Sequence, residues 1–103
     1  MLGLGKWKFF VDTMFFRGDA YLLVSEKDGA YDAAVEVPGM QVPKIDFWGI
    51  QQEGSTITGM ARTDLLRGKD IAFSCTFDGD RASGFLKVPF LGKIKMSNGV
   101  KVG

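Results

Sequence analysis

The most constraining feature of the sequence is an acidic residue followed by glycine that recurs every 25 positions, as Asp28-Gly29, Glu53-Gly54 and Asp78-Gly79. Such pairs, flanked by alternating apolar residues, are a strong signal for a β-hairpin, because glycine supplies the positive φ that a tight turn between twisted strands needs. A small residue also follows six positions after each acidic one, at Ala34, Gly59 and Gly84. The repeat therefore predicts a hairpin unit, with two strands of about eight residues, one tight turn and one longer connection.

Alternation of apolar and polar residues places a strand on each side of every tight turn. Eight strands are predicted, over residues 5–12, 19–26, 30–37, 44–52, 55–62, 70–77, 81–88 and 92–97. After the last of these, Asn98-Gly99 is a candidate for one more turn, with Val100 and Val102 extending the sheet edge. Helix is expected at most as a single turn within residues 62–69, because no segment carries an apolar stripe of helical period.

Eight sequential strands with one apolar face must hide that face, and closing into a barrel does so while removing both sheet edges. The sequence therefore predicts an all-β protein with a single domain over residues 1–103, an antiparallel up-and-down eight-stranded barrel. The alternative is a two-sheet β-sandwich. A chain of this length, with 46% apolar residues, can build a core without a disulfide or a metal ion.

The residues expected to face inward differ widely in size. Large side chains such as Trp7 and Phe73 share the inward phase with Gly49, Gly59 and Gly84. If large residues face small ones, the barrel is filled; if the small residues gather at one end, they leave a cavity there. The sequence leaves both arrangements open.

Several classes of chemistry are excluded by composition. The chain has no histidine, which rules out Ser-His and Cys-His nucleophile pairs and histidine-ligated metals. The single cysteine, Cys75, rules out an internal disulfide and lies on an inward phase, where an inert thiol is expected. We predict no catalytic residue, metal or cofactor. Enzymatic activity is not expected, and an isomerase or cyclase working by cavity shape alone is the remaining enzymatic alternative.

Charge and hydropathy bear on location and partners. A net charge of +1 creates no global field that would recruit nucleic acid or membrane. The N-terminal residues lack a signal-peptide pattern, and the longest uninterrupted apolar run, residues 20–24, is far too short to span a membrane. We therefore expect a cytoplasmic protein that binds no nucleic acid and has no membrane span.

In a meander, successive connections alternate between the two ends of the sheet. The three acidic-glycine turns should therefore share one end, the tight-turn end, and connections 13–18, 38–43, 63–69 and 89–91 should gather at the other, the long-connection end. The long-connection end is rich in Phe, Met, Leu and Pro, which is unusual for loops. It also carries six basic residues (Arg17, Lys44, Arg62, Arg67, Lys69 and Lys93) against Asp64, whereas the tight-turn end is acidic.

This contrast predicts a ligand-binding mouth, with two alternatives: loops that plug the barrel, or loops that contact a second copy of the chain. Trp7 would brace one end of the interior, and the hydroxyl of Tyr31 would supply a polar contact inside it. The predicted ligand-binding residues are Trp7, Phe15, Phe16, Arg17, Tyr31, Met40, Arg67 and Phe90. Of these, Phe15, Phe16, Met40 and Phe90 would line the mouth, and Arg17 or Arg67 would hold an anionic group.

The Gly-x-Trp of Gly5-Lys6-Trp7, which opens the first strand before a meander of hairpins, resembles the calycin group: lipocalins, fatty-acid-binding proteins and avidin-like barrels. In lipocalins a similar tryptophan plugs one end of the barrel. Residues 78–94, DGDRASGFLKVPFLGKI, also look like the ending of small lipocalin-like bacterial barrels of unknown function. The chain departs from lipocalins in lacking a C-terminal helix and a cysteine pair, and from fatty-acid-binding proteins in lacking a helical lid. The resemblance implies a fold and no particular ligand.

The predicted function is non-catalytic binding of a small apolar or amphipathic molecule by the barrel, with anionic molecules included in the class. The alternative is a structural or assembly protein that uses its apolar loops and its outward-facing aromatic residues, Phe10, Trp48 and Phe85, for homo-oligomer or partner contacts.

Overall fold

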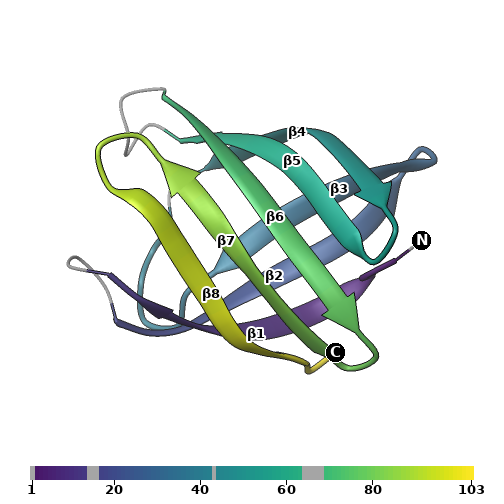
Figure 1. Cartoon of the computed structure of the whole chain (residues 1–103), viewed down its shortest axis with the longest axis horizontal. Helices are drawn as coiled ribbons and strands as arrows, with labels where there is room; N and C mark the ends of the chain where they lie inside the picture. The colour runs from purple at the N-terminus through teal and green to yellow at the C-terminus, as the bar shows by residue number, and fades with distance from the viewer. Residues whose placement is uncertain (1, 14–16, 43, 64–68) are drawn as a thin grey trace.

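The computed structural model describes residues 2–13, 17–42, 44–63 and 69–103. Within them the chain forms eight antiparallel strands and no helix (Figure 1). The strands are β1 (Gly5–Asp12), β2 (Arg17–Lys27), β3 (Ala30–Glu36), β4 (Ile45–Glu53), β5 (Thr56–Thr63), β6 (Asp70–Asp78), β7 (Arg81–Val88) and β8 (Gly92–Lys101). This confirms the predicted all-β up-and-down architecture.

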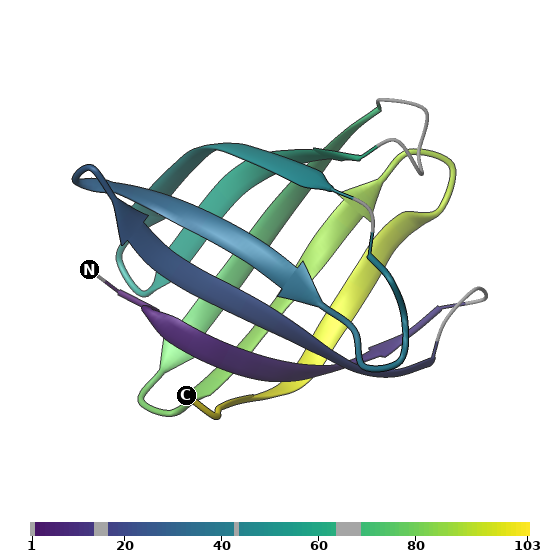
Figure 2. The same cartoon turned by 180° about the vertical axis from the view of Figure 1, so that it is seen from behind.

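The eight strands belong to one sheet in the order β3-β2-β1-β8-β7-β6-β5-β4, so the two-sheet sandwich is not formed. Pairing of β1 with β8 curls the sheet into a barrel, as Figures 1 and 2 show from opposite sides. Strands β3 and β4 pack beside each other without a hydrogen-bonded ladder. The barrel is therefore nearly closed, and it retains two sheet edges that full closure would have removed.

The three acidic-glycine turns lie at one end of the barrel, as predicted, and both chain termini lie there too (Figure 1). The first turn differs from the other two by one residue. Asp28 and Gly29 both occupy the turn with positive φ, 53° and 82°, whereas Glu53 and Asp78 are the last residues of their strands. A shift of one residue exchanges the two faces of a strand, so Ala34 is exposed while Gly59 is buried.

Two strands contain a β-bulge that the alternation of the sequence conceals. In β4 the register shifts between Trp48 and Gln51, and Gly49 takes a φ of 62°. Gly49 is exposed and Ile50 faces the core, which corrects the expectation that Gly49 faces inward. In β8 the extra residue lies at Asn98, whose φ of 53° lets the strand continue to Lys101 instead of turning.

The barrel interior is filled by large residues that face small ones. Gly59 pairs with Phe73, and a Cβ placed on Gly59 would lie 2.6 Å from Cζ of that ring. Gly99 accommodates the ring of Phe9 in the same way, at 2.5 Å. The void between β2–β3 and β4–β6 that these side chains leave has a volume of only about 10 Å³, close to the space of one water molecule. Around these residues the barrel adopts the filled arrangement, the first of the two that the sequence left open.

Candidate functional site

The tight-turn end of the barrel is sealed by residues 2–4. The indole Nε1 of Trp7 donates a hydrogen bond to the carbonyl of Gly3 at 2.8 Å, and the indole packs edge-on against Phe77 at a centroid distance of 4.7 Å. The hydroxyl of Tyr31 donates to the carbonyl of Leu2 at 2.9 Å, with Oε1 of Gln52 a further acceptor at 3.2 Å. These polar contacts fix the N-terminal segment over the core and also join β3 to β4 at this end.

The predicted site residues therefore fall into separate places. Trp7 and Tyr31 lie at the sealed end, and Met40 and Phe90 lie on connections at the opposite end, 53% and 90% exposed. Arg17 lies beside Asp12, with 3.9 Å between Nε and a carboxylate oxygen, and 5.8 Å from the centre of the Phe10 ring. The remaining three predictions, Phe15, Phe16 and Arg67, lie outside the described residues.

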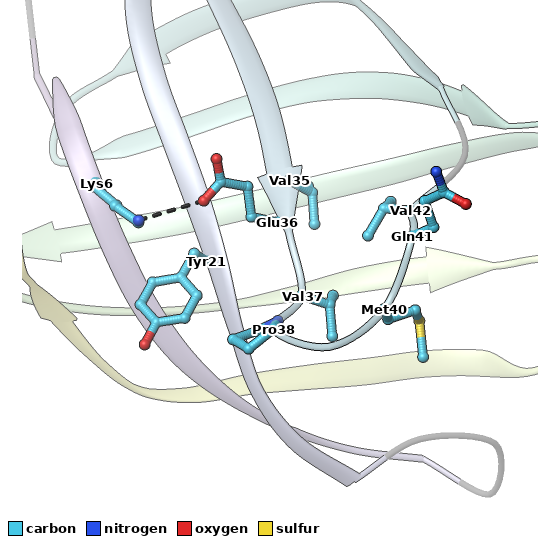
Figure 3. A pocket seen from close by; sticks show the side chains of 9 residues that line it. All are labelled: Lys6, Tyr21, Val35, Glu36, Val37, Pro38, Met40, Gln41 and Val42. Atoms are coloured by element: carbon cyan, nitrogen blue, oxygen red, sulfur yellow. Dashed lines mark ion pairs between the residues drawn. The ribbon is translucent and has the colours of Figure 1, made fainter.

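An open hollow of about 620 Å³ lies where the 37–42 connection leaves β3 (Figure 3). It is lined by Lys6, Tyr21, Val35, Glu36, Val37, Pro38, Met40, Gln41 and Val42. The connection is shaped by a turn in which the amide of Met40 donates to the carbonyl of Val37 at 3.1 Å, with Gly39 at a φ of 75°. The turn displays the side chain of Met40 on the wall of the hollow.

The polar side of this hollow comes from three neighbouring strands. Lys6 on β1 points toward Glu36 on β3, with 3.3 Å between Nζ and a carboxylate oxygen (Figure 3). The same ammonium lies 4.8 Å from the ring centre of Tyr21 on β2. Both charged side chains are partly exposed, 39% for Lys6 and 57% for Glu36, so a solvent-borne ion can reach them.

Met40 is the one residue of this hollow that the sequence predicted as a ligand contact. Lys6, Tyr21 and Glu36 were missed because they lie on the outward phase of their strands, where charged residues are normally solvated. Their proximity depends on the register Tyr21↔Glu36 and Lys6↔Leu23. The Asp28-Gly29 turn sets the first of these pairings, because Lys27 opposite Ala30 brings Tyr21 opposite Glu36. The pairing of β1 with β2 follows no acidic-glycine turn, so the position of Lys6 beside them was not indicated.

The outward-facing aromatic residues lie beneath cations. Arg62 lies 5.3 Å from the ring centre of Trp48, and Lys93 lies 4.1 Å from that of Phe85. Arg62 also donates two hydrogen bonds to Asp70, at 2.7 and 3.0 Å. Among the described residues, the aromatic rings that contact each other are inside the barrel, and Phe10, Trp48 and Phe85 are not brought together.

Groups capable of nucleophilic or metal chemistry are sparse in the described part of the chain. The thiol of Cys75 is buried, and desolvation by burial raises its pKa to about 12, so it is a neutral thiol at physiological pH. The residues that the structure describes contain no group of three or more metal-ligating side chains. No helix among them is long and apolar enough to cross a membrane.

No protein-family model, curated protein or solved structure matches this chain. Its function therefore has to be inferred from the residues and the geometry. The eight-stranded antiparallel meander agrees with the architecture that the resemblance to lipocalins implied, and agreement in fold does not fix a function.

Proposed function

We propose that this protein binds a small amphipathic molecule, without catalysis, in the hollow between β1–β3 and the 37–42 connection. The observation that carries the proposal is the combination of an apolar wall with a lysine ammonium in a volume of about 620 Å³. Ligand sites commonly have volumes of about 300–1,000 Å³, with mostly apolar walls and a few polar groups that fix orientation.

Binding in this hollow differs from binding deep inside the barrel. The void that the structure shows between β2–β3 and β4–β6 has a volume of about 10 Å³, which is too small for an alkyl chain. A hydrocarbon chain would instead lie along Val37, Met40 and Val42, at the rim of the long-connection end. The sealed tight-turn end, with Trp7 and Tyr31, would then support the barrel and would not contact the ligand.

The polar head would be held at Lys6. A carboxylate or phosphate would compete with Glu36 for the ammonium, and the cost of that exchange is small because partly exposed ion pairs contribute only about 0–1 kcal/mol. The ring of Tyr21 beneath the ammonium adds apolar surface beside the head. An anionic amphiphile is therefore the preferred ligand class.

Titration calorimetry with dodecanoate, below its micelle concentration, tests this proposal. Lys6→Met removes the ammonium and keeps the aliphatic stem, and we expect affinity to fall by about two- to fivefold, the value of one partly exposed ion pair. Met40→Ser should also weaken binding, because it removes apolar wall. Lys27→Met, at the tight-turn end, is the matched control and should leave affinity unchanged.

Dodecyltrimethylammonium, which carries a cationic head group on a similar alkyl chain, tests whether the site prefers anionic or cationic amphiphiles. Preferential binding of this cation over dodecanoate, lost on Glu36→Gln, would show that the carboxylate is the recognition group and would contradict the anionic preference. Absence of heat with either amphiphile, or an equal loss of affinity in Lys6→Met and Lys27→Met, would refute a site in this hollow.

A further inference from the structure

The turn between β7 and β8 places a phenylalanine in a conformation that its side chain disfavours. The amide of Leu91 donates to the carbonyl of Val88 at 3.2 Å, which defines a four-residue turn with Pro89 and Phe90 at its centre. Phe90 has a φ of 73°. Proline followed by a residue of positive φ is the pattern of a type II turn, in which glycine or asparagine normally takes the second central position.

The chain contains a second turn of the same type, with glycine at the second central position. In Val37-Pro38-Gly39-Met40 the amide of the fourth residue again donates to the carbonyl of the first, at 3.1 Å, and Gly39 has a φ of 75°. The two turns have the sequences VPGM and VPFL. Glycine is thus the residue that this backbone geometry favours, and Phe90 occupies the equivalent place at a conformational cost.

Packing does not compensate for that cost. The side chain of Phe90 is 90% exposed, the largest exposed fraction among the exposed large apolar residues of the described chain. A bulky apolar residue that is both strained and solvated stabilises nothing within the fold. Strain of this kind is typical of sites that act on a partner.

Lysines without acidic partners surround the turn. Lys87 and Lys93 are directly opposite each other across β7 and β8, and Lys95 follows on the same face. Lys69 immediately precedes β6, the neighbour of β7. None of these four forms an ion pair within the described part of the chain. Lys8, Lys27, Arg81 and Lys101 form none either, so the distinguishing feature of the four lysines is that they are clustered. Lys87 and Lys93 both lie over the ring of Phe85, with 5.9 and 4.1 Å between each ammonium and the ring centre. One ring shared by two cations does not supply a negative charge, and like charges placed opposite each other destabilise a sheet, so the cluster keeps its net positive charge.

We propose that this part of the surface, the Phe90 corner, docks on an anionic lipid surface. The Phe90 corner consists of Pro89, Phe90, Leu91 and the four lysines Lys69, Lys87, Lys93 and Lys95. The ring of Phe90 enters the boundary between head groups and acyl chains, and the ammonium groups contact the phosphates and carboxylates of the head groups. Figure 2 shows this turn and the 37–42 connection at the same end of the barrel but on different sides, so the proposal is separate from the small-molecule site.

Charge and shape favour a lipid surface over a protein partner. The four lysines, none of which forms an ion pair with a described carboxylate, complement an anionic surface over several neighbouring positions. A fluid bilayer also accepts one projecting ring without a preformed pocket, whereas a stable protein interface needs about 800 Å² on each partner, with its aromatic anchor in a fitted pocket.

Sedimentation with vesicles tests the proposal. The protein should bind vesicles of phosphatidylcholine with phosphatidylserine and should not bind vesicles of phosphatidylcholine alone, and binding should weaken as salt is raised. Lys87→Gln should weaken binding about fivefold, as expected for one lysine near an anionic surface. Phe90→Gly should weaken it about tenfold or more without loss of fold stability, a combination that a purely structural role for Phe90 would not produce. Lys27→Gln, at the opposite end, is the control.

Equal sedimentation with both kinds of vesicle, or unchanged binding in Phe90→Gly, would overturn the proposal. So would a dimer in analytical ultracentrifugation that Phe90→Gly abolishes, because the ring would then contact a second copy of the chain. Dodecanoate binding by Phe90→Gly is measured in parallel. If Phe90→Gly loses vesicle binding but still binds dodecanoate, the two proposed sites are independent and each can be refuted separately.

Discussion

Replacing Phe90 by glycine should make the protein more stable, although the substitution removes a large apolar side chain. The left-handed conformation costs a residue with a side chain about 1–2 kcal/mol, and this cost disappears in Phe90→Gly. Glycine offsets about 0.5–1 kcal/mol of this gain, because it increases the conformational freedom of the unfolded chain. The ring is 90% exposed, so almost no buried contact is lost, and the net gain should be about 0.5–1 kcal/mol.

For a chain of 103 residues, a gain of this size raises the midpoint of thermal unfolding by about 2–5 °C. The assay is thermal unfolding followed by circular dichroism, with urea unfolding as a second measure of the free energy. Phe90→Ala is the matched control, because it removes the ring and keeps a side chain in the left-handed conformation. It should show no comparable gain.

The reverse substitution in the equivalent turn completes the test. Gly39 has a φ of 75°, and a Cβ placed on it would meet no atom within 4 Å. Gly39→Phe should therefore lower stability by a similar amount through the backbone alone. A midpoint for Phe90→Gly at or below that of Phe90→Ala, or a neutral Gly39→Phe, would refute the reasoning.

Two further predictions concern the barrel wall. Gly84→Ala should destabilise the protein by about 2–3 kcal/mol in urea unfolding, because its Cβ would collide with the carbonyl oxygen of Ser74 on β6. Ser83→Ala, an exposed neighbour, should stay within about 0.5 kcal/mol of the parent, and equal effects would be inconsistent with this explanation. Burial raises the pKa of Cys75 from 9.0 to about 12, so the unfolded chain loses this proton first, and stability should fall as pH rises from 9 toward 12, by at most about 1.4 kcal/mol per pH unit. Cys75→Ala should show a shallower decline over that interval, and identical slopes would exclude this thiol as the cause.

The course of the strands could be predicted because turns and alternation are local signals. The acidic-glycine pairs gave the tight turns, and β1 spans the predicted residues. The faces of the strands were less predictable. Gly49 and Asn98 introduce bulges through positive φ, and the turn at Asp28 is offset by one residue from the other two. Each bulge, and the offset turn, exchanges the inward-facing and outward-facing residues of its strand. None of them changes the pattern of apolar residues enough to be detected from the sequence.

The gap between β3 and β4 also depends on more than local pattern. Residues 37–44, the longest connection between consecutive strands, join β3 to β4. No hydrogen-bonded ladder forms between these two strands. The alternation of apolar and polar residues indicates that a segment forms a strand, but it does not indicate whether the edge of that strand pairs with another strand. The predicted full closure therefore failed at one seam, although the order of strands was correct.

The candidate site was predicted only in part, for a similar reason. Met40 could be identified because an apolar residue in a loop is unusual. Lys6 and Glu36 lie 30 positions apart in sequence and meet only through the pairing of β1, β2 and β3. The hydroxyl of Tyr31, predicted to supply a polar contact inside the barrel, donates to the backbone of Leu2 at the sealed end, a partner that no strand pattern could indicate.

The proposed ligand site can be tested most directly by backbone amide NMR during titration with dodecanoate. Binding in the hollow predicts saturable shifts at residues 35–42 and at Lys6, with little change around Trp7 and Tyr31 at the sealed end. Shifts concentrated instead at inward-facing Phe73 and Cys75, or no saturable shift at any amide, would contradict it.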